Sequence, residues 1–398
     1  MLRPIGQIAA PLAQQYGTSI TQRATGLQRT ATAIWRSLQG GIQPVQYANG
    51  ARCIKIKVGH SGKTFGLGRQ QDCVAKQPKL RTFSQASAVT NESVVSQRDD
   101  DAGQVSGVQT TLAVSITRRG VGLHSGVESI VTLLPAPAGT GRSFIVEGSN
   151  QSSQEIPAHV DYVSDTRLST AVRAGDCTVQ TVEHLLSALQ GLGVHNVRVQ
   201  MTGGNEIPLL DGSASGWVAA CKEAGIVPAV DGNGKHVERR SRTLKEVVTV
   251  REGDAWVAGF PSARPMLTYG IHFPQVPAIG GPHWYTYTPE EGPGTSFEND
   301  VAPARTFGVF EQFEQLRVAG LIKGGSLENA LVCSISKGWL NPPLRFPNEP
   351  CRHKLLDLIG DLALAEVDGS GFPNAHVVAY KASHTLHVKF AKALLQKM

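Results

Sequence analysis

The chain lacks the features that mark membrane-spanning and disulfide-rich proteins. Of its 398 residues 41% are hydrophobic, yet no apolar run approaches the roughly 20 residues of a membrane-spanning helix. Its six cysteines include no Cys-x-x-Cys pair, a usage typical of buried thiols in a reducing compartment rather than of a disulfide framework or zinc ribbon. We therefore expect a soluble globular protein, long enough for two or three domains.

Acidic residues are missing from the start of the chain. The first one is Asp72, and residues 1–91 contain twelve Lys or Arg against that single acid, a balance of +11. The other 26 basic and 31 acidic residues carry −5, which gives the net charge of +6. The basic character therefore belongs to the leader and does not predict nucleic-acid binding.

This leader has the composition of an organelle import sequence, rich in Ser, Thr, Ala and Gln. The spacing of Arg3, Arg23, Arg29 and Arg36 favours the mitochondrion, with the plastid as the alternative, and a disordered bacterial tail stays open. Residues 82–107 have neither helical nor strand periodicity, so we predict a targeting leader and linker over 1–107. Residues 59–64, GHSGKT, resemble a phosphate-binding loop but lack its first glycine.

Patterns after residue 107 predict two α+β domains, divided by the polar segment 230–241. For the first domain, 108–235, turn signals and apolar alternation predict strands at 111–117, 129–134 and 197–201. Helical periodicity there predicts helices at 178–190 and 214–224. For the second domain, 242–398, we predict strands at 245–251, 255–260, 267–273, 330–335 and 375–380, and helices at 309–319 and 350–366. The halves would suit an internal duplication, although no repeat period is visible.

The predicted helix 350–366 places three ionisable side chains on one face. His353, Asp357 and Asp361 are four residues apart, while leucines and an isoleucine occupy another face. A histidine and a carboxylate one turn apart can bind the same metal ion. Cys351 points in another direction on this helix, which makes it the weaker candidate ligand.

A third ligand would have to come from elsewhere in the fold. Glu183 and His184 lie on the side of the predicted helix 178–190 that faces away from its leucines. His184 would complete a His, His, Asp set with one position left for water, and Glu183 suits a general base. The alternative interpretation is two amphipathic helices with solvated polar faces.

The residues after the last predicted strand add a candidate acid. His384 would stand at a strand end, where it could protonate a leaving group, and Asp361 would orient it and raise its pKa. Lys354 would add positive charge for an anionic substrate or an oxyanion. His376 and His387 have no such partner in the pattern, so we expect them to be ordinary core or surface histidines.

Six motifs, in order, resemble the zinc-dependent UDP-3-O-acyl-N-acetylglucosamine deacetylases of lipid A biosynthesis. The resemblance covers the chain from about residue 110 to the C-terminus. The motifs are TVEHL at 181–185 with LQGLG at 189–193, IPLLDGSA at 207–214, ARTFG at 304–308, GGS at 324–326, HKxxDxxGD at 353–361 and AYKxxH at 379–384.

The resemblance implies a reaction and a metal. The family removes the N-acetyl group from UDP-3-O-(3-hydroxyacyl)-N-acetylglucosamine, giving the free amine and acetate, in the committed step of lipid A biosynthesis. His184, His353 and Asp357 would bind Zn2+, although iron(II) would also suit two histidines and an aspartate. Glu183 would be the base that takes a proton from the attacking water.

The resemblance also implies roles for the remaining site residues. Thr306 would help to stabilise the oxyanion, and His384, held by Asp361, would protonate the departing amine. Lys354 would contact anionic groups of the substrate. Phe307 would pack on the glucosamine or the acyl portion, and a core phenylalanine is an equally good interpretation.

In this family two α+β domains, each a mainly antiparallel sheet layered with helices, place their helices between the sheets and the site at the domain interface. A small insert, here at about 310–336, would form a hydrophobic passage for the acyl chain. Its apolar residues, which could instead fill the core, are Phe310, Phe313, Leu316, Leu321, Ile322 and Leu331. We expect a monomer with a small-molecule substrate, no nucleic-acid partner and no membrane span.

Two other functions stay open at this point. A zinc amidohydrolase that acts on a different N-acetylated sugar would need the same metal motif. A binding protein with a structural metal would need only the ligands. The presence of both Glu183 and His384 favours an enzyme over a binding protein.

Overall fold

The computed structural model describes residues 105–147, 153–289, 297–341, 343–366, 369 and 371–398. All of them belong to one compact unit, residues 99–398. The predicted leader lies outside the described residues up to residue 104, and so does the GHSGKT segment. No helix of the described ranges is long and apolar enough to cross a membrane.

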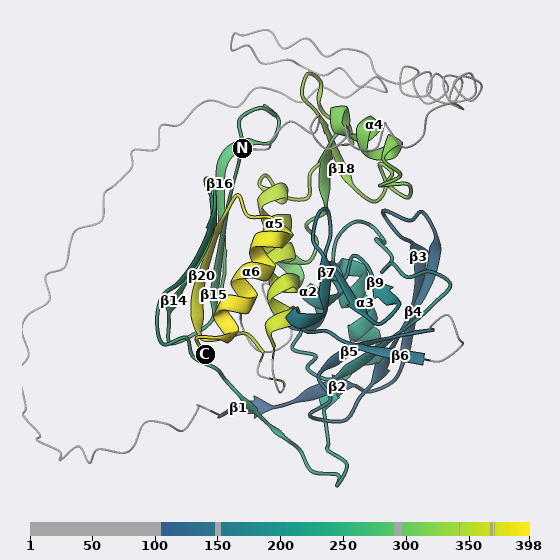
Figure 1. The fold of residues 1–398 in the computed structure, drawn as a ribbon, viewed down its shortest axis with the longest axis vertical. Helices are drawn as coiled ribbons and strands as arrows, with labels where there is room; N and C mark the ends of the chain where they lie inside the picture. Colours follow the sequence, from purple (N-terminus) through teal and green to yellow (C-terminus); the bar gives the residue numbers. More distant parts are fainter. Residues whose placement is uncertain (1–104, 148–152, 290–296, 342, 367–368, 370) are drawn as a thin grey trace, which may run out of the picture. The chain divides into compact units, whose positions relative to one another are not determined.

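Two five-stranded sheets with the same strand order form the framework of this unit (Figure 1). The first has the order β3 (Ile116–Val121), β4 (Glu128–Pro135), β10 (Val197–Thr202), β5 (Arg142–Glu147) and β6 (Ser153–Pro157). The second has the order β13 (Val248–Glu252), β14 (Ala255–Pro261), β20 (Ala375–Tyr380), β15 (Met266–Phe273) and β16 (Gly280–Tyr287).

The pairing pattern is also repeated in the two sheets. The central strand, β10 or β20, runs parallel to one neighbour, β5 or β15, while the other pairs are antiparallel. The predicted α+β class with mainly antiparallel sheets is therefore confirmed. The common strand order supports the internal duplication that the sequence does not show as a repeat.

Each half places one helix before its central strand and one after it. In the first half these are α2 (Glu183–Gly191) and α3 (Ser215–Ala224), and in the second α5 (Glu349–Leu362) and α6 (His384–Leu395). Helix α3 contacts β3, α5 contacts β15 and β16, and α6 contacts β13 and β14. The helices lie between the two sheets, as predicted (Figure 1).

The two halves meet where α2 packs on α5. At the crossing, Gly360 of α5 faces the backbone of Glu183, and a Cβ atom at Gly360 would lie 2.0 Å from the carbonyl oxygen of Glu183. Only a residue without a side chain permits this approach. The crossing brings the Glu183–His184 pair beside the His353, Asp357 and Asp361 face of α5.

Shorter elements complete the fold. Three strands, β7 (Val163–Asp165), β8 (Ala171–Ala174) and β9 (Cys177–Val179), form a small sheet in the first half. Two strand pairs link distant segments: β1 (Val105–Val108) with β12 (Glu238–Arg240), and β2 (Thr110–Leu112) with β11 (Ile226–Pro228). Single helical turns are η2 (Val160–Tyr162), η3 (Phe297–Val301) and η4 (Ala363–Ala365).

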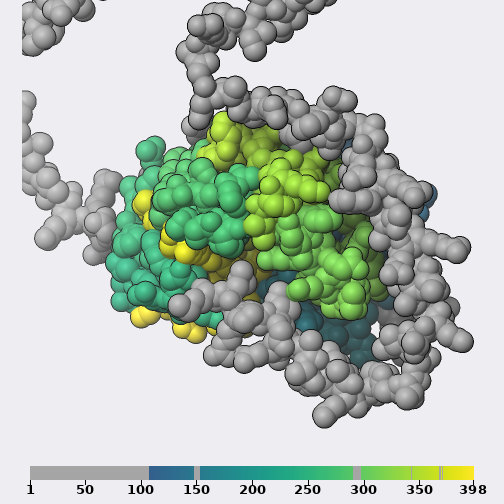
Figure 2. Space-filling model, turned by 90° about the horizontal axis from the view of Figure 1, so that it is seen from above, coloured from purple at the N-terminus to yellow at the C-terminus, as the bar shows by residue number. Residues whose placement is uncertain are grey.

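The segment predicted as an insert forms a small α+β layer. It consists of β17 (Phe307–Val309), α4 (Phe310–Val318), β18 (Leu331–Ser334) and β19 (Gly338–Trp339). Seen from above, this layer (lighter green) lies beside strands of the second sheet, with C-terminal residues (yellow) visible between them (Figure 2). The domain limits 108–235 and 242–398 stay a prediction.

Strands β5, β6 and β16 of the two large sheets and most of the short strands were not predicted from the sequence, and three further elements differ from the prediction. The strand predicted over 111–117 is two strands, β2 and β3, because each pairs with a different partner. The helix predicted from residue 178 begins at Glu183, since Cys177–Val179 pair with β8 instead. Helix α6 was not predicted: His384 is its first residue rather than a strand end, and the Ser383 side chain caps the helix by accepting from the Leu386 amide.

Candidate active site

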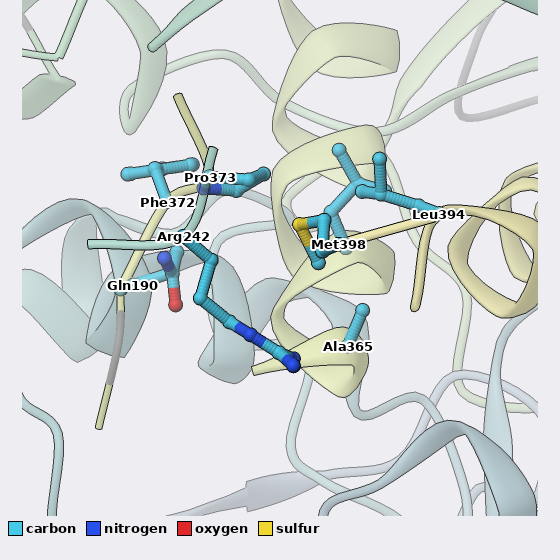
Figure 3. Close-up of a pocket in the computed structure, with 9 residues that line it drawn as sticks. Gln190, Arg242, Ala365, Phe372, Pro373, Leu394 and Met398 are labelled. Atoms are coloured by element: carbon cyan, nitrogen blue, oxygen red, sulfur yellow. The ribbon is translucent and has the colours of Figure 1, made fainter. Parts of the chain in front are cut away.

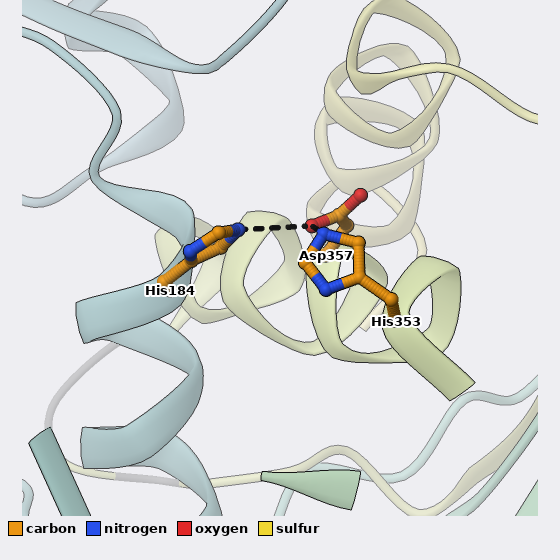
Figure 4. Close-up of side chains that lie close together, drawn as sticks. All are labelled: His184, His353 and Asp357. Carbon is orange, nitrogen blue, oxygen red and sulfur yellow. Dashed lines mark ion pairs between the residues drawn. The ribbon is translucent and has the colours of Figure 1, made fainter. Parts of the chain in front are cut away.

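The three residues predicted as metal ligands converge between α2 and α5 (Figure 4). The Nε2 atoms of His353 and His184 lie 3.3 Å and 3.6 Å from Oδ1 of Asp357. All three side chains are buried, with exposed fractions of 2% for His353, 5% for His184 and 3% for Asp357. Solvated polar faces, the alternative interpretation of these helices, are therefore excluded.

The nitrogen and oxygen atoms of this cluster are better placed to bind a metal ion than to form hydrogen bonds with one another. Oδ1 of Asp357, the atom that both Nε2 atoms approach, is buried without a hydrogen-bond partner among the described residues. Such orphaned polar atoms are rare in protein interiors. Nδ1 of His353 lies 3.0 Å from the carbonyl oxygen of Ala304. A hydrogen on that nitrogen leaves the Nε2 lone pair directed at the cluster, as in many metal-binding histidines.

The charges of the cluster also favour a bound cation. Burial lowers the pKa of His353 to about 4, although Asp357 partly opposes the shift, so this imidazole is neutral. Burial alone would raise the pKa of Asp357, but His353 and Lys354 outweigh it and hold that pKa well below its usual range. Neutral histidines and an ionised carboxylate are the protonation states that metal binding requires.

Glu183 and His384 face each other beside this cluster. Oε2 of Glu183 accepts a hydrogen bond of 3.0 Å from the backbone amide of Thr170, while Oε1 lies 3.9 Å from Nε2 of His384. Burial raises the pKa of Glu183, and the charges of His384 and His184 partly oppose the shift. A carboxylate with a raised pKa is a better proton acceptor near neutral pH.

His384 is held by Asp361, as the sequence pattern predicted. Nδ1 of His384 lies 2.8 Å from Oδ2 of Asp361. Burial opposes a charged imidazole, but the Asp361 carboxylate outweighs burial and raises the pKa of His384 to about 9. The site therefore places a proton donor, the His384 imidazolium, opposite the carboxyl group of Glu183.

The remaining candidates lie around the cluster at different distances. Lys354 donates to Oδ2 of Asp357 over 2.7 Å. The ring of Phe307 stands edge-on to His353, with 6.3 Å between ring centroids, and its neighbour Thr306 is half-buried.

Cys351 is buried, its thiol donates to the Tyr269 carbonyl, and burial raises the thiol pKa to about 12. This thiol is engaged away from the cluster.

Two residues of the site were missed in the sequence. The hydroxyl of Thr170 donates to Oδ1 of Asp361 over 2.5 Å, and Nδ1 of His387 lies 2.8 Å from Oδ2 of the same carboxylate. The prediction that His387 has no such partner is wrong. The contact was missed because helix α6 was not predicted from the sequence, and residues 384 and 387 share a face only on a helix. Thr170 has no sequence signal, since its contact depends on tertiary packing.

A pocket elsewhere in the unit does not involve these residues. It is lined by Gln190 of α2, by Arg242 and Phe372, and by Leu394 and Met398 near the C-terminus (Figure 3). None of the predicted site residues lines this pocket. It therefore lies apart from the candidate active site.

Comparisons with known proteins agree with the motifs. The LpxC family model, described as UDP-3-O-acyl N-acetylglycosamine deacetylase, matches residues 109–396. The UDP-3-O-acyl-N-acetylglucosamine deacetylase of Nostoc sp. is 50% identical over 287 residues, which are 72% of this chain and 98% of that protein.

Two further relatives extend the comparison. The deacetylase of the same name from Thermosynechococcus vestitus is 49% identical over 293 residues, 74% of this chain and 96% of that protein. An Arabidopsis thaliana protein described as a probable UDP-3-O-acyl-N-acetylglucosamine deacetylase 1, mitochondrial, is 46% identical over 294 residues, 72% of this chain and 88% of that protein. The chain therefore belongs to the UDP-3-O-acyl-N-acetylglucosamine deacetylase family.

Proposed function

We propose that the chain hydrolyses the N-acetyl amide of UDP-3-O-(3-hydroxyacyl)-N-acetylglucosamine, so that water and the amide become acetate and a free amine. The names of the relatives support the substrate. The observation that carries the proposal is the meeting of His184, His353 and Asp357 with a proton acceptor and a proton donor. A site for a structural metal would need neither Glu183 nor His384.

His184, His353 and Asp357 are the proposed ligands, and Zn2+ is the proposed metal, with iron(II) as the alternative for this donor set. Zn2+ held by them would polarise the acetyl carbonyl and lower the pKa of a water molecule to about 7. The carbonyl of Ala304 fixes the orientation of the His353 ring.

Glu183 is the proposed general base. Because the Thr170 amide occupies Oε2, the other oxygen, Oε1, is free to accept a proton from the attacking water. The raised pKa of Glu183 makes its carboxylate a competent acceptor.

His384 is the proposed general acid. Its Nδ1 is engaged by Asp361, so the proton for the departing amine comes from Nε2. After one turnover Glu183 carries a proton and His384 lacks one. Their separation of 3.9 Å lets the proton return from Oε1 of Glu183 to Nε2 of His384 with little rearrangement, which restores the starting state.

Thr306, Lys354 and Phe307 are the proposed substrate contacts. The hydroxyl of Thr306 would donate to the developing oxyanion, and the amine of Lys354 would bind anionic groups from the edge of the cluster. Phe307 lies between the rings of His353 and Phe273, 5.7 Å from the latter, where it could pack on the sugar or acyl portion.

The acyl chain is proposed to run along the layer of residues 307–339. Leu331 is fully buried there and Ile322 nearly so, so these two side chains fill the core of the layer rather than face a substrate. Helix α4 has no buried residue, and it leaves Phe310 half exposed and Val318 82% exposed. An apolar surface of this kind suits the hydrocarbon of a lipid-like substrate.

The proposed location is the mitochondrion, with the plastid as the alternative. The acid-poor leader and its spaced arginines support import, and Arabidopsis relatives carry the word mitochondrial in their names. We further propose that the chain acts as a monomer on a small-molecule substrate.

An acetate-release assay on the metal-loaded full chain tests the proposal. UDP-3-O-(3-hydroxymyristoyl)-N-acetylglucosamine should be deacetylated, and analogues without UDP or without the acyl chain should be poor substrates. Glu183→Gln should keep the metal and lose at least about a hundredfold in kcat, the usual contribution of a general base. Equal rates with the analogues would favour a broader sugar amidohydrolase, and no acetate from any of them would contradict the proposal.

A further inference from the structure

The carboxylate of Asp361 is the hub of a buried hydrogen-bond network larger than a pair with His384. Oδ1 accepts from the hydroxyl of Thr170 over 2.5 Å. Oδ2 lies 2.8 Å from Nδ1 of His384 and 2.8 Å from Nδ1 of His387. Asp361 has no exposed surface, so these three contacts replace the hydration that an ionised carboxylate has in water.

His387 is itself held at both ring nitrogens. It has no exposed surface, and its Nε2 lies 3.1 Å from the hydroxyl oxygen of Tyr269 on β15. The same hydroxyl lies 2.7 Å from the carbonyl oxygen of Ala382, two residues before α6 begins, so its single hydrogen goes either to that carbonyl or to Nε2 of His387. The second sheet therefore fixes the His387 ring, and the ring in turn contacts Oδ2 of Asp361.

The donor directions follow from the shared oxygen. Oδ2 can only accept, so both Nδ1 atoms must carry the hydrogen that points to it. For His384 this leaves Nε2 as the atom facing Glu183. For His387, which stands one helical turn further along α6, it makes the Nδ1 hydrogen a second anchor of the carboxylate.

A metal ion does not explain this second cluster as well as hydrogen bonds do. Asp361, His384 and His387 have ligand-type atoms close enough to hold an ion. Two ligands of one tetrahedral Zn2+, each about 2.0 to 2.1 Å from it, would lie about 3.3 Å apart. The two separations of 2.8 Å are instead ordinary lengths for charge-assisted hydrogen bonds.

We propose that His387 is a positioning residue for the deacetylation: together with Thr170 it locks the Asp361 carboxylate, which keeps Nε2 of His384 aimed at the leaving amine. Two anchors on different oxygens fix both the position and the plane of the carboxylate. Loss of one anchor would let Oδ2 turn away, so that His384 would be held in its productive direction for less of the time. This inference rests on the proposed function.

Double-mutant kinetics test whether His387 acts through His384. His387→Phe keeps a planar ring but removes both nitrogens, and it should lower kcat about tenfold, part of the hundredfold or more that acid catalysis contributes, with KM within about twofold. In a chain that already carries His384→Ala, the same change should lower kcat by less than about twofold. His387→Asn, whose amide can still donate to Asp361, should recover most of the loss.

A control variant tests whether the effect depends on where the histidine lies rather than on the loss of its ring nitrogens. His376 lies on β20 and hydrogen-bonds to the side chain of Thr268, 2.9 Å away, outside the network. His376→Phe makes the same chemical change in the same sheet and should leave kcat and metal content at their wild-type values. All variants should bind one metal ion per chain, which shows that the ligand cluster is intact.

A readout independent of turnover completes the test. With histidine labelled by 15N, the Nδ1 hydrogen of His384 should exchange slowly with solvent in the wild-type chain and faster in His387→Phe. An equal loss of kcat in both backgrounds, equal impairment of the Phe and Asn variants, or unchanged exchange would overturn the inference. If the variants give one of these results while the wild-type chain still releases acetate, only the role of His387 is overturned. If the wild-type chain releases no acetate, the proposed function itself is contradicted.

Discussion

Gly360 of α5 lies against the backbone carbonyl of Glu183 of α2, so the helix that carries two proposed ligands touches the main chain of the proposed base. The functional groups of the two halves are placed by a contact between backbones. The first prediction addresses this contact.

Gly360→Ala should destabilise the protein and impair the site. The added Cβ would lie 2.0 Å from the Glu183 carbonyl oxygen, a backbone atom that cannot move without its helix. Overpacking of this kind costs about 3 kcal/mol in the free energy of unfolding, measured by denaturant titration. Gly232→Ala is the matched control, since a Cβ there meets nothing within 4 Å. If both variants unfold alike, the close contact does not matter.

Asp361→Asn should shift the alkaline limb of the pH–rate profile. Asp361 raises the pKa of His384 to about 9 against the effect of burial, so the proton donor stays charged up to that pH. Removal of the carboxylate charge lowers this pKa, and the decline of kcat/KM with rising pH should begin at a lower pH. An alkaline limb that does not move would mean that another group supplies the proton.

Metal binding should stabilise the folded chain through His184, His353 and Asp357. Zn2+ that binds only the folded state at a free concentration 100 times its dissociation constant adds about 2.7 kcal/mol to the free energy of unfolding. Chelation should therefore lower the melting temperature of the wild-type chain. His184→Ala should show little difference between the two conditions, and a shift as large as that of the wild type would remove His184 from the ligand set.

Arg142→Leu should destabilise the fold without changing the chemistry. Arg142 and Glu366 form a buried ion pair with a separation of 2.6 Å. Loss of the guanidinium leaves the buried Glu366 carboxylate without its ion-pair partner Arg142, which costs about 3 to 5 kcal/mol. Adding Glu366→Leu should recover part of that loss in thermal unfolding. The kcat of the folded fraction should stay at the wild-type value, because neither side chain contacts the candidate site.

Spacing along helices made much of the candidate site predictable. His353, Asp357 and Asp361 follow one another every fourth residue, and a helix converts that interval into a shared face. Glu183 and His184 were recognisable because they stand away from the leucines of their helix. These predictions depend only on the local helical conformation, which the spacing of apolar residues predicts well.

Other contacts depend on parts of the chain that periodicity does not describe. Thr170 and Ala304 contact the site from loops, where no repeating pattern marks a residue. His387 could be recognised only after its helix was known, and the beginning of α6 was interpreted as a strand end. Residues 178 and 179 were predicted as the start of a helix, yet pairing with β8 outweighed the local preference.

The repeated strand order gives α2 and α5 equivalent places in two similar halves. Because the site is assembled from both halves, the rate of turnover reports how closely they are packed together. One half supplies the proposed base and one ligand, and the other supplies two ligands and the acid. A small separation at the Gly360 contact would stop the reaction while both sheets keep their hydrogen bonds. Loss of acetate release should therefore precede loss of circular dichroism when the protein is heated or exposed to denaturant.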